Sequence, residues 1–142
     1  MFKLCNNYLK LIFLFFIGGF LYVSIELAFR GRSHISMLVA GGASFLLIGL
    51  LNEVFTWRIP VMIQMFLSSI IVTVIEFFTG IVVNMWLNLG VWDYSDLPFN
   101  YMGQVCLTFS VAWFFLSLPA ILLDDYLRYW LLDGEKPRYK LF

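Results

Sequence analysis

The sequence predicts an all-α membrane protein, a single domain in which four transmembrane helices form a bundle. Composition is the first reason, because 62% of the 142 residues are hydrophobic and only 13% are charged. A soluble domain of this size keeps about a quarter of its residues charged. The second reason is that the apolar residues form four long runs separated by polar connections. The 20% aromatic share also suits a chain with two membrane interfaces.

The first predicted span covers residues 8–29. Its apolar part is longer than the roughly 7–15 residues of a signal peptide core. It ends at charged residues, Glu26, Arg30 and Arg32, instead of a small-residue cleavage site. We therefore expect a retained helix, followed by a break at residues 31–34.

The second predicted span, residues 36–51, is short and uncharged, and Asn52 and Glu53 follow it. It carries Ser36, Ala40 and Ser44 at four-residue spacing, beside two glycines. Small residues on one helix face allow the backbone of another helix to approach closely. This face therefore predicts tight helix packing.

The third predicted span, residues 61–89, follows Pro60, which suits the first turn of a helix. A straight helix of this length would measure about 43 Å, well beyond the hydrocarbon core of a bilayer. We therefore expect it to tilt, protrude or break near Gly80 or Gly90. The fourth predicted span covers residues 101–123, and residues 124–142 form the predicted cytoplasmic tail.

Lysine and arginine predict the orientation, since they concentrate on the cytoplasmic side of membrane proteins. With four spans, one side receives seven of the nine basic residues: Lys3, Lys10, Arg58, Arg128, Lys136, Arg138 and Lys140. The other side receives only Arg30 and Arg32. We therefore expect both termini in the cytoplasm and the connection at residues 92–100 outside.

Two carboxyl groups are predicted to lie at similar depth in the outer half of the membrane. At about 1.5 Å per residue, Glu26 lies about 26 Å and Glu76 about 24 Å from the inner ends of their helices. A carboxylate within a span costs about 2.5–3.5 kcal/mol, so it tends to face a cavity or a partner. We expect both groups to face the interior of the bundle.

The neighbours of these carboxyls leave two interpretations open for each. Glu76 shares a helix face with Thr73 and Asn84, which predicts either the wall of a hydrated pathway or a polar helix interface. Glu26 has Tyr22 and Arg30 four residues to either side. This arrangement predicts either an ion pair within the helix or a ligand or proton site.

The outer connection is rich in chemically distinctive residues. It contains Trp92, Asp93, Tyr94, Asp96 and Asn100. Asp and Asn side chains commonly shape turns or cap helices, which favours a compact connection between two helices. The aromatic residues and Pro98 leave a second interpretation open, a lid that covers an outer pocket.

No motif for catalysis, a metal or a cofactor is recognisable. His34 is the single histidine, and the two cysteines, Cys5 and Cys106, lie far apart in the sequence. The sequence has no phosphate-binding loop, no nucleophile motif and no basic patch for nucleic acid. We expect a non-enzyme without metal or cofactor that does not bind nucleic acid.

Several segments resemble one family. Residues 20–26 resemble its F-x-G/Y-x-x-x-E pattern, and residues 31–37, 92–100 and 103–107 are similar to its other segments. This bacterial family is labelled "putative ABC-transporter type IV". The resemblance covers nearly the whole chain and implies a small, permease-like polytopic protein of the cell membrane.

Two functions fit these features. The first is a transporter or channel subunit with an acidic outer-half site, which favours protons or other cations. Because four short helices enclose a poor pore alone, we expect it to associate with further copies or with another membrane protein. The alternative is a non-transporting scaffold that binds a membrane partner through its small-residue faces and a cytoplasmic partner through its tail.

Overall fold

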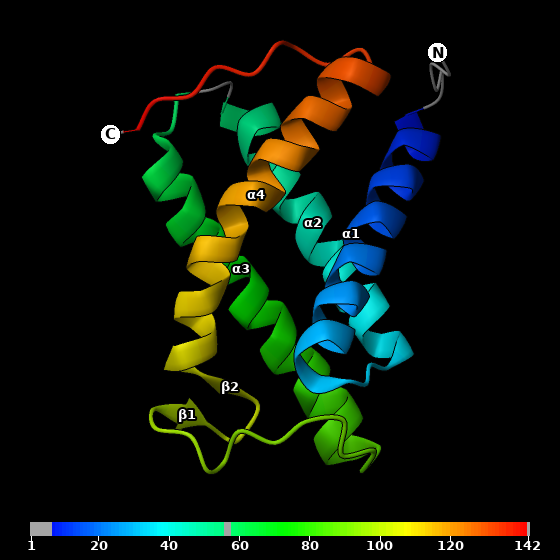
Figure 1. Ribbon diagram of the computed structural model, residues 1–142, viewed down its shortest axis with the longest axis vertical. Helices are drawn as coiled ribbons and strands as arrows, with labels where there is room; N and C mark the ends of the chain where they lie inside the picture. Colours follow the sequence, from blue (N-terminus) through cyan, green and yellow to red (C-terminus); the bar gives the residue numbers. More distant parts are fainter. Residues whose placement is uncertain (1–6, 56–57, 142) are drawn as a thin grey trace.

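The computed structural model describes residues 7–55 and 58–141 and has the form of an up-and-down helical bundle (Figure 1). In this part of the chain, four helices are long and apolar enough to cross a membrane. They are α1 (Asn7–Arg30), α2 (Ile35–Phe55), α3 (Val61–Gly80) with its extension, and α4 (Leu107–Leu131). The predicted all-α, four-span fold is confirmed.

The extension of α3 is a turn of π-helix, η1 (Ile81–Trp86). Together they form a run of 26 residues, about 39 Å long at the usual α-helical rise. The break expected near Gly80 or Gly90 occurs in two stages, because the helix widens directly after Gly80 and ends at Trp86. A connection without helix then follows, in which Gly90 has a positive φ of 57°.

Two helices are longer than the sequence predicted. α2 continues through Asn52 and Glu53 to Phe55, because Asn52 is buried and hydrogen bonded within the bundle. α4 continues to Leu131, so Asp124 and Asp125 belong to the helix, whereas we had expected them to begin the tail. Both aspartates are buried, and polar side chains with partners inside a bundle need not end a helix.

α4 also begins later than predicted. The segment near Tyr101 forms a short antiparallel hairpin, in which β1 (Asn100–Tyr101) pairs with β2 (Val105–Cys106). The turn between these strands has two residues in the left-handed region, Met102 and Gly103. The helix therefore starts only at Leu107.

The small-residue face of α2 packs against α1 within the same chain. A Cβ atom added to Gly41 would collide with Tyr22, and one added to Gly42 would collide with Phe15. The same holds for Gly18 of α1, which lies directly against Phe45. This close approach fixes α1 and α2 as a tightly packed pair.

The two ends of the bundle differ, and we name them by what covers them. The loop end carries residues 87–106, and the tail end carries the start of α1 and residues 132–141 (Figure 1). Lys10 Nζ donates to Leu132 O at 2.8 Å, and Val61 N donates to Lys140 O at 2.7 Å. These bonds hold the tail against the helices. Lys3, Cys5 and Phe142 lie outside the described residues.

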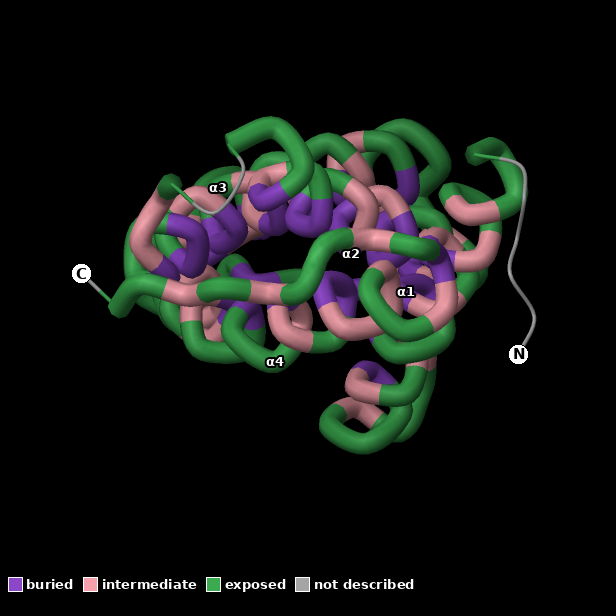
Figure 2. Tube along the Cα trace, turned by 90° about the horizontal axis from the view of Figure 1, so that it is seen from above, coloured by how far each residue is buried: buried purple, intermediate pink, exposed green. Residues whose placement is uncertain are grey.

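Buried positions point toward the middle of the bundle, and exposed positions face outward (Figure 2). Many of the outward-facing side chains are large and apolar, as in Phe16, Phe66 and Phe115. Such a surface suits lipid. Several of the inward-facing side chains are polar or charged, and they define the candidate site.

Candidate functional site

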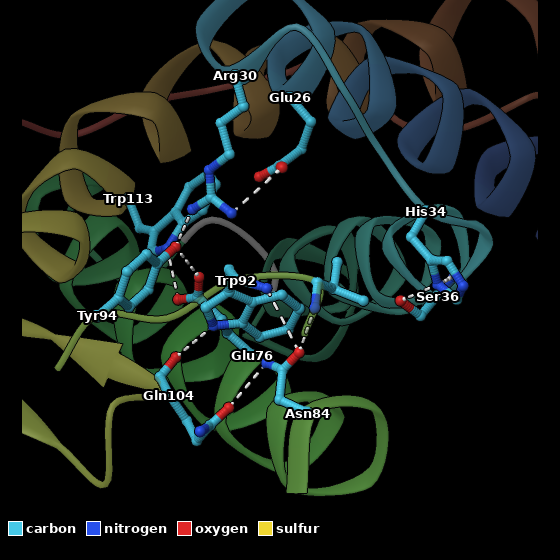
Figure 3. Close-up of polar contacts among 11 residues, drawn as sticks. Glu26, Arg30, His34, Ser36, Glu76, Asn84, Trp92, Tyr94, Gln104 and Trp113 are labelled. Carbon is cyan, nitrogen blue, oxygen red and sulfur yellow. Dashed lines mark hydrogen bonds and ion pairs between the residues drawn. The ribbon is translucent and has the colours of Figure 1, made fainter. Parts of the chain in front are cut away.

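Glu76 occupies the centre of the polar cluster near the loop end. It lies on α3 and is only 4% exposed. Its Oε1 atom accepts a hydrogen bond of 3.0 Å from the Tyr94 hydroxyl, and its Oε2 atom accepts one of 3.2 Å from Trp113 Nε1 (Figure 3). Both carboxylate oxygens therefore have a donor, which offsets part of the cost of burying the charge.

Tyr94 comes from the connection after η1, yet its side chain is buried between the helices. Its ring stacks on Phe109 with centroids 4.7 Å apart. Burial raises the pKa of Tyr94 well above its usual value, and the nearby Glu76 carboxylate raises it further. Tyr94 therefore stays protonated and remains a donor to Glu76.

Arg30 connects the two carboxyls. It donates to the Tyr94 hydroxyl, and its Nη1 atom lies 3.5 Å from Glu26 Oε2. Its guanidinium also lies 5.2 Å from the centroid of the Tyr94 ring, close enough for a cation–π contact. Glu26, Arg30, Tyr94 and Glu76 thus form one continuous polar chain (Figure 3).

The sequence predicted that Glu26 and Glu76 both face the interior of the bundle. Both side chains are buried inside the bundle, at 7% and 4% exposure. Their carboxyls are joined through Arg30 and Tyr94. Glu26 therefore has the intrahelical ion pair that its spacing to Arg30 suggested, and this pair is also part of the cluster.

Tyr22 contributes through its ring. It stacks on Trp113 with centroids 5.2 Å apart and an angle of 24° between the planes. This contact restricts the indole whose N–H group binds Glu76. Thr73 is not part of the cluster around Glu76. Its hydroxyl pairs instead with Ser110 Oγ of α4 at 2.8 Å.

Asn84 anchors the connection to η1. Its Oδ1 atom accepts a bond of 2.7 Å from Val91 N, and its Nδ2 atom donates to Gln104 Oε1 at 2.9 Å. Trp92 is buried and donates through Nε1 to Gln104 O at 2.9 Å. These bonds hold the segment directly before Tyr94 against the bundle (Figure 3).

The remaining polar residues of the loop lie outside the cluster. Asp93 is exposed, and its Oδ1 atom accepts a bond of 2.9 Å from Ser95 N, which lowers the pKa of Asp93. Asn100 donates to Leu97 O at 2.8 Å and accepts from Gly103 N at 3.1 Å. Asp96 is exposed. Asp93 and Asn100 thus shape the loop.

A pocket of about 170 Å³ reaches the cluster from the loop end. Glu26 and Arg30 form part of its wall, together with Arg32, Ser33, His34 and residues 89–91. His34 turns toward Ser36, with Nδ1 2.8 Å from Ser36 Oγ, and lies apart from Glu76 (Figure 3). Glu26 is therefore the carboxyl that borders the accessible space.

Two contributors were not predicted as site residues. Trp113 lies on α4, and Gln104 lies in the turn of the hairpin. The sequence signal for Trp113 was its indole N–H group, because a tryptophan that is buried generally donates this group to an acceptor. Among residues 7–55 and 58–141, no group of three His, Cys, Asp or Glu side chains could hold a metal ion.

The four apolar helices and the loop that reaches into them define a small polytopic membrane protein. The model of the family described as "Putative ABC-transporter type IV" matches residues 13–132, and the chain belongs to this family. The matched range contains the whole cluster around Glu76. Fold and family together fit a transporter-like membrane subunit. No solved structure matches the chain.

Proposed function

We propose that the protein is a transporter or channel subunit in which Glu76 and Glu26 form a binding site for a proton or another small cation. The main support is the environment of Glu76, a buried carboxylate with a donor on each oxygen. An ionisable residue inside a membrane span is expensive and generally marks an ion or proton path. The site contains two carboxyls and one guanidinium, so its charge favours cations when both carboxyls are ionised.

Binding at Glu76 is coupled to the loop through Tyr94. An ionised carboxylate accepts hydrogen bonds from both Tyr94 and Trp113. A protonated Glu76 has one oxygen that must act as a donor, so it no longer accepts equally from both. Protonation therefore weakens one of these bonds. If the weakened bond is that to Tyr94, the loop is released from the bundle and the site opens.

A reconstituted flux assay tests this function. Purified protein in liposomes should carry protons or a monovalent cation, and Glu76→Gln should abolish or uncouple that flux. Glutamine preserves the size of the side chain and one acceptor oxygen, but it removes the charge and the second acceptor. Asp96→Asn is the matched control, because it removes an exposed carboxylate at the same end of the bundle.

The alternative remains a scaffold that does not transport. It needs a surface for its partner, but Ala40, Gly41, Gly42 and Ser44 of α2 are buried inside this chain. A scaffold would therefore bind through its lipid-facing helix surfaces or its tail. The absence of flux in the unmodified protein would favour this alternative, whereas full flux in the Glu76→Gln protein across a range of pH would contradict the role of Glu76. Association with further copies would appear in cross-linking within native membranes.

A further inference from the structure

A second polar feature runs through the middle of the bundle, away from the loop end. On α3, Gln64, Ser68 and Glu76 follow one another at intervals of four and eight residues, so they share one face. Gln64 and Ser68 are 1% and 0% exposed. Gln64 lies about 18 Å from Glu76 along the helix. Polar groups thus continue from the candidate site toward the tail end.

Two other helices present matching polar positions. On α4, Trp113, Ser117 and Asp124 share a face and are buried. On α2, Ser44 and Asn52 are buried two helical turns apart. Figure 2 shows buried positions of α2, α3 and α4 turned toward the middle of the bundle. We name this set of seven residues, with Gln64 and Ser68 of α3, the polar column.

Several atoms of the polar column lack a partner. Ser44 Oγ, Gln64 Oε1, Ser68 Oγ and Asp124 Oδ1 are buried and make no hydrogen bond to the described part of the chain. Ser117 behaves differently, since its hydroxyl donates to Trp113 O at 2.6 Å, within its own helix. An unbonded polar group costs several kcal/mol inside a membrane, so internal water is the expected partner.

A cavity of about 80 Å³ lies along this column. Trp113 and Tyr22 line it, and so do the hydroxyl-bearing Ser44 and Ser117. A buried water needs roughly 10–15 Å³ of such space and two to four polar neighbours, so the cavity has room for a short file of waters. Ile48, Val72 and other apolar side chains form most of the remaining wall.

The column ends in a second acidic cluster at the tail end. Asp125 Oδ2 accepts bonds from Asn52 Nδ2 at 2.6 Å and from the Tyr139 hydroxyl at 2.8 Å. Asp124 Oδ2 accepts a bond of 2.8 Å from Arg128 Nε, four residues later. Arg128 Nη1 in turn lies 3.9 Å from Glu53 Oε1.

The two ends of the bundle therefore share one arrangement. At each end a tyrosine from a non-helical segment donates to a buried carboxylate, Tyr94 to Glu76 and Tyr139 to Asp125. At each end an arginine also pairs with a carboxylate four residues before it in its own helix. The tail end thus offers the same chemical groups as the candidate site.

We propose that Asp124 and Asp125 form a second proton-binding site, joined to Glu76 by internal waters along the polar column. This inference rests on the proposed function and narrows the transported species to protons. It also puts the path inside one protomer. A metal cation would need many oxygens to replace its hydration shell, whereas the cavity offers few. A proton needs only a hydrogen-bonded file, in which each transfer breaks one O–H bond and forms another.

Proton flux and side-chain hydration are the two measurements that test this proposal. In liposomes, a potassium diffusion potential drives protons toward a trapped pH-sensitive dye. Asp125→Asn and Glu76→Gln should each reduce the flux to that of empty liposomes, and Asp96→Asn should not. If Asp125→Asn does not purify as a folded protein, Ser68→Ala replaces it, since it removes a buried, unbonded hydroxyl of the polar column with little change in volume.

The hydration of the polar column is measured by cysteine labelling, which does not depend on a flux assay. In a background with Cys5 and Cys106 replaced by alanine, Ser68→Cys should react with a small water-soluble thiol reagent. Ser24→Cys should not, because Ser24 is exposed on a span and therefore faces lipid. An unreactive Ser68→Cys overturns the water file whatever the flux results are.

The flux outcomes separate this inference from the proposed function. Full proton flux in Asp125→Asn, with loss in Glu76→Gln, overturns the second site and leaves the proposed function standing. Flux of a metal cation without protons also overturns the second proton site and leaves the proposed function standing. The absence of any flux in the unmodified protein overturns both.

Discussion

The Tyr94 hydroxyl, in a loop, and the Glu76 carboxylate, in the last turns of α3, are joined by a hydrogen bond of 3.0 Å. The bond spans 18 residues of sequence and connects a non-helical segment to the interior of the bundle. Since Tyr94 also accepts from Arg30, a single phenol holds the two halves of the acidic cluster together.

Replacing Tyr94 by phenylalanine tests this relationship. The ring keeps its contact with Phe109, but Glu76 loses a donor and Arg30 loses an acceptor. We expect the free energy of unfolding to fall by about 1–3 kcal/mol, the usual cost of an unsatisfied buried polar group. Unfolding in detergent, followed by circular dichroism, measures it. Tyr101→Phe is the control, because Tyr101 is mostly exposed. Equal stability of both variants would contradict the role of this bond.

The contact between α1 and α2 predicts a strong effect at Gly41. Alanine at this position would collide with Tyr22, which itself stacks on Trp113. We expect Gly41→Ala to destabilise the protein by about 1–3 kcal/mol through overpacking, and to disturb the indole that binds Glu76. Thermal unfolding and the near-ultraviolet signal of the aromatic residues report both effects. Ala28→Val, which adds volume on an exposed face of α1, should leave both signals unchanged. A fully stable Gly41→Ala protein would argue against close helix contact.

The anchoring of the loop predicts a local change on removal of Asn84. Asn84→Ala deletes the acceptor for Val91 N and the donor to Gln104. Hydrogen–deuterium exchange should become faster in the segment that contains Val91 and Trp92, with little change in α1. Met85→Ala serves as a neighbouring control, since Met85 is exposed. Unchanged exchange in this segment would mean that other contacts hold the loop.

Orientation remains a prediction based on the seven-to-two distribution of basic residues. The structure puts the start of α1 and residues 132–141 at one end of the bundle, and the loop at the other (Figure 1). Single cysteines at Ser95 and Lys140 test the direction in intact cells with an impermeant reagent. We expect labelling at position 95 in intact cells, and at position 140 only after permeabilisation. The reverse pattern would invert the topology.

Much of the fold could be predicted, because membrane spans depend on local composition and length. The expectation that Glu26 and Glu76 lie at similar depth rested on the helical rise alone, and the pairing of Glu26 with Arg30 followed from their spacing. The donors to Glu76 could not be predicted in this way. Trp113 lies 37 residues away in sequence, and the position of Tyr94 depends on how the loop folds back.

Asp124 and Asp125 illustrate a different limit of the sequence. Two adjacent carboxylates after an apolar run usually indicate the end of a span. Here they are buried, because Asn52, Arg128 and Tyr139 supply hydrogen bonds. Those donors lie on another helix, one turn further along α4 and in the tail. Only the tertiary structure brings them together.

The chain order of these partners has a consequence for biosynthesis. Glu26 pairs with Arg30 four residues later, so α1 carries both members of this ion pair when it is synthesised. Glu76 depends on Tyr94 and Trp113, and both are synthesised after α3. An isolated carboxylate is costly in hydrocarbon, so α3 gains stability in the bilayer once α4 arrives. We expect α1 and α2 to integrate on their own, and α3 and α4 to enter the lipid together.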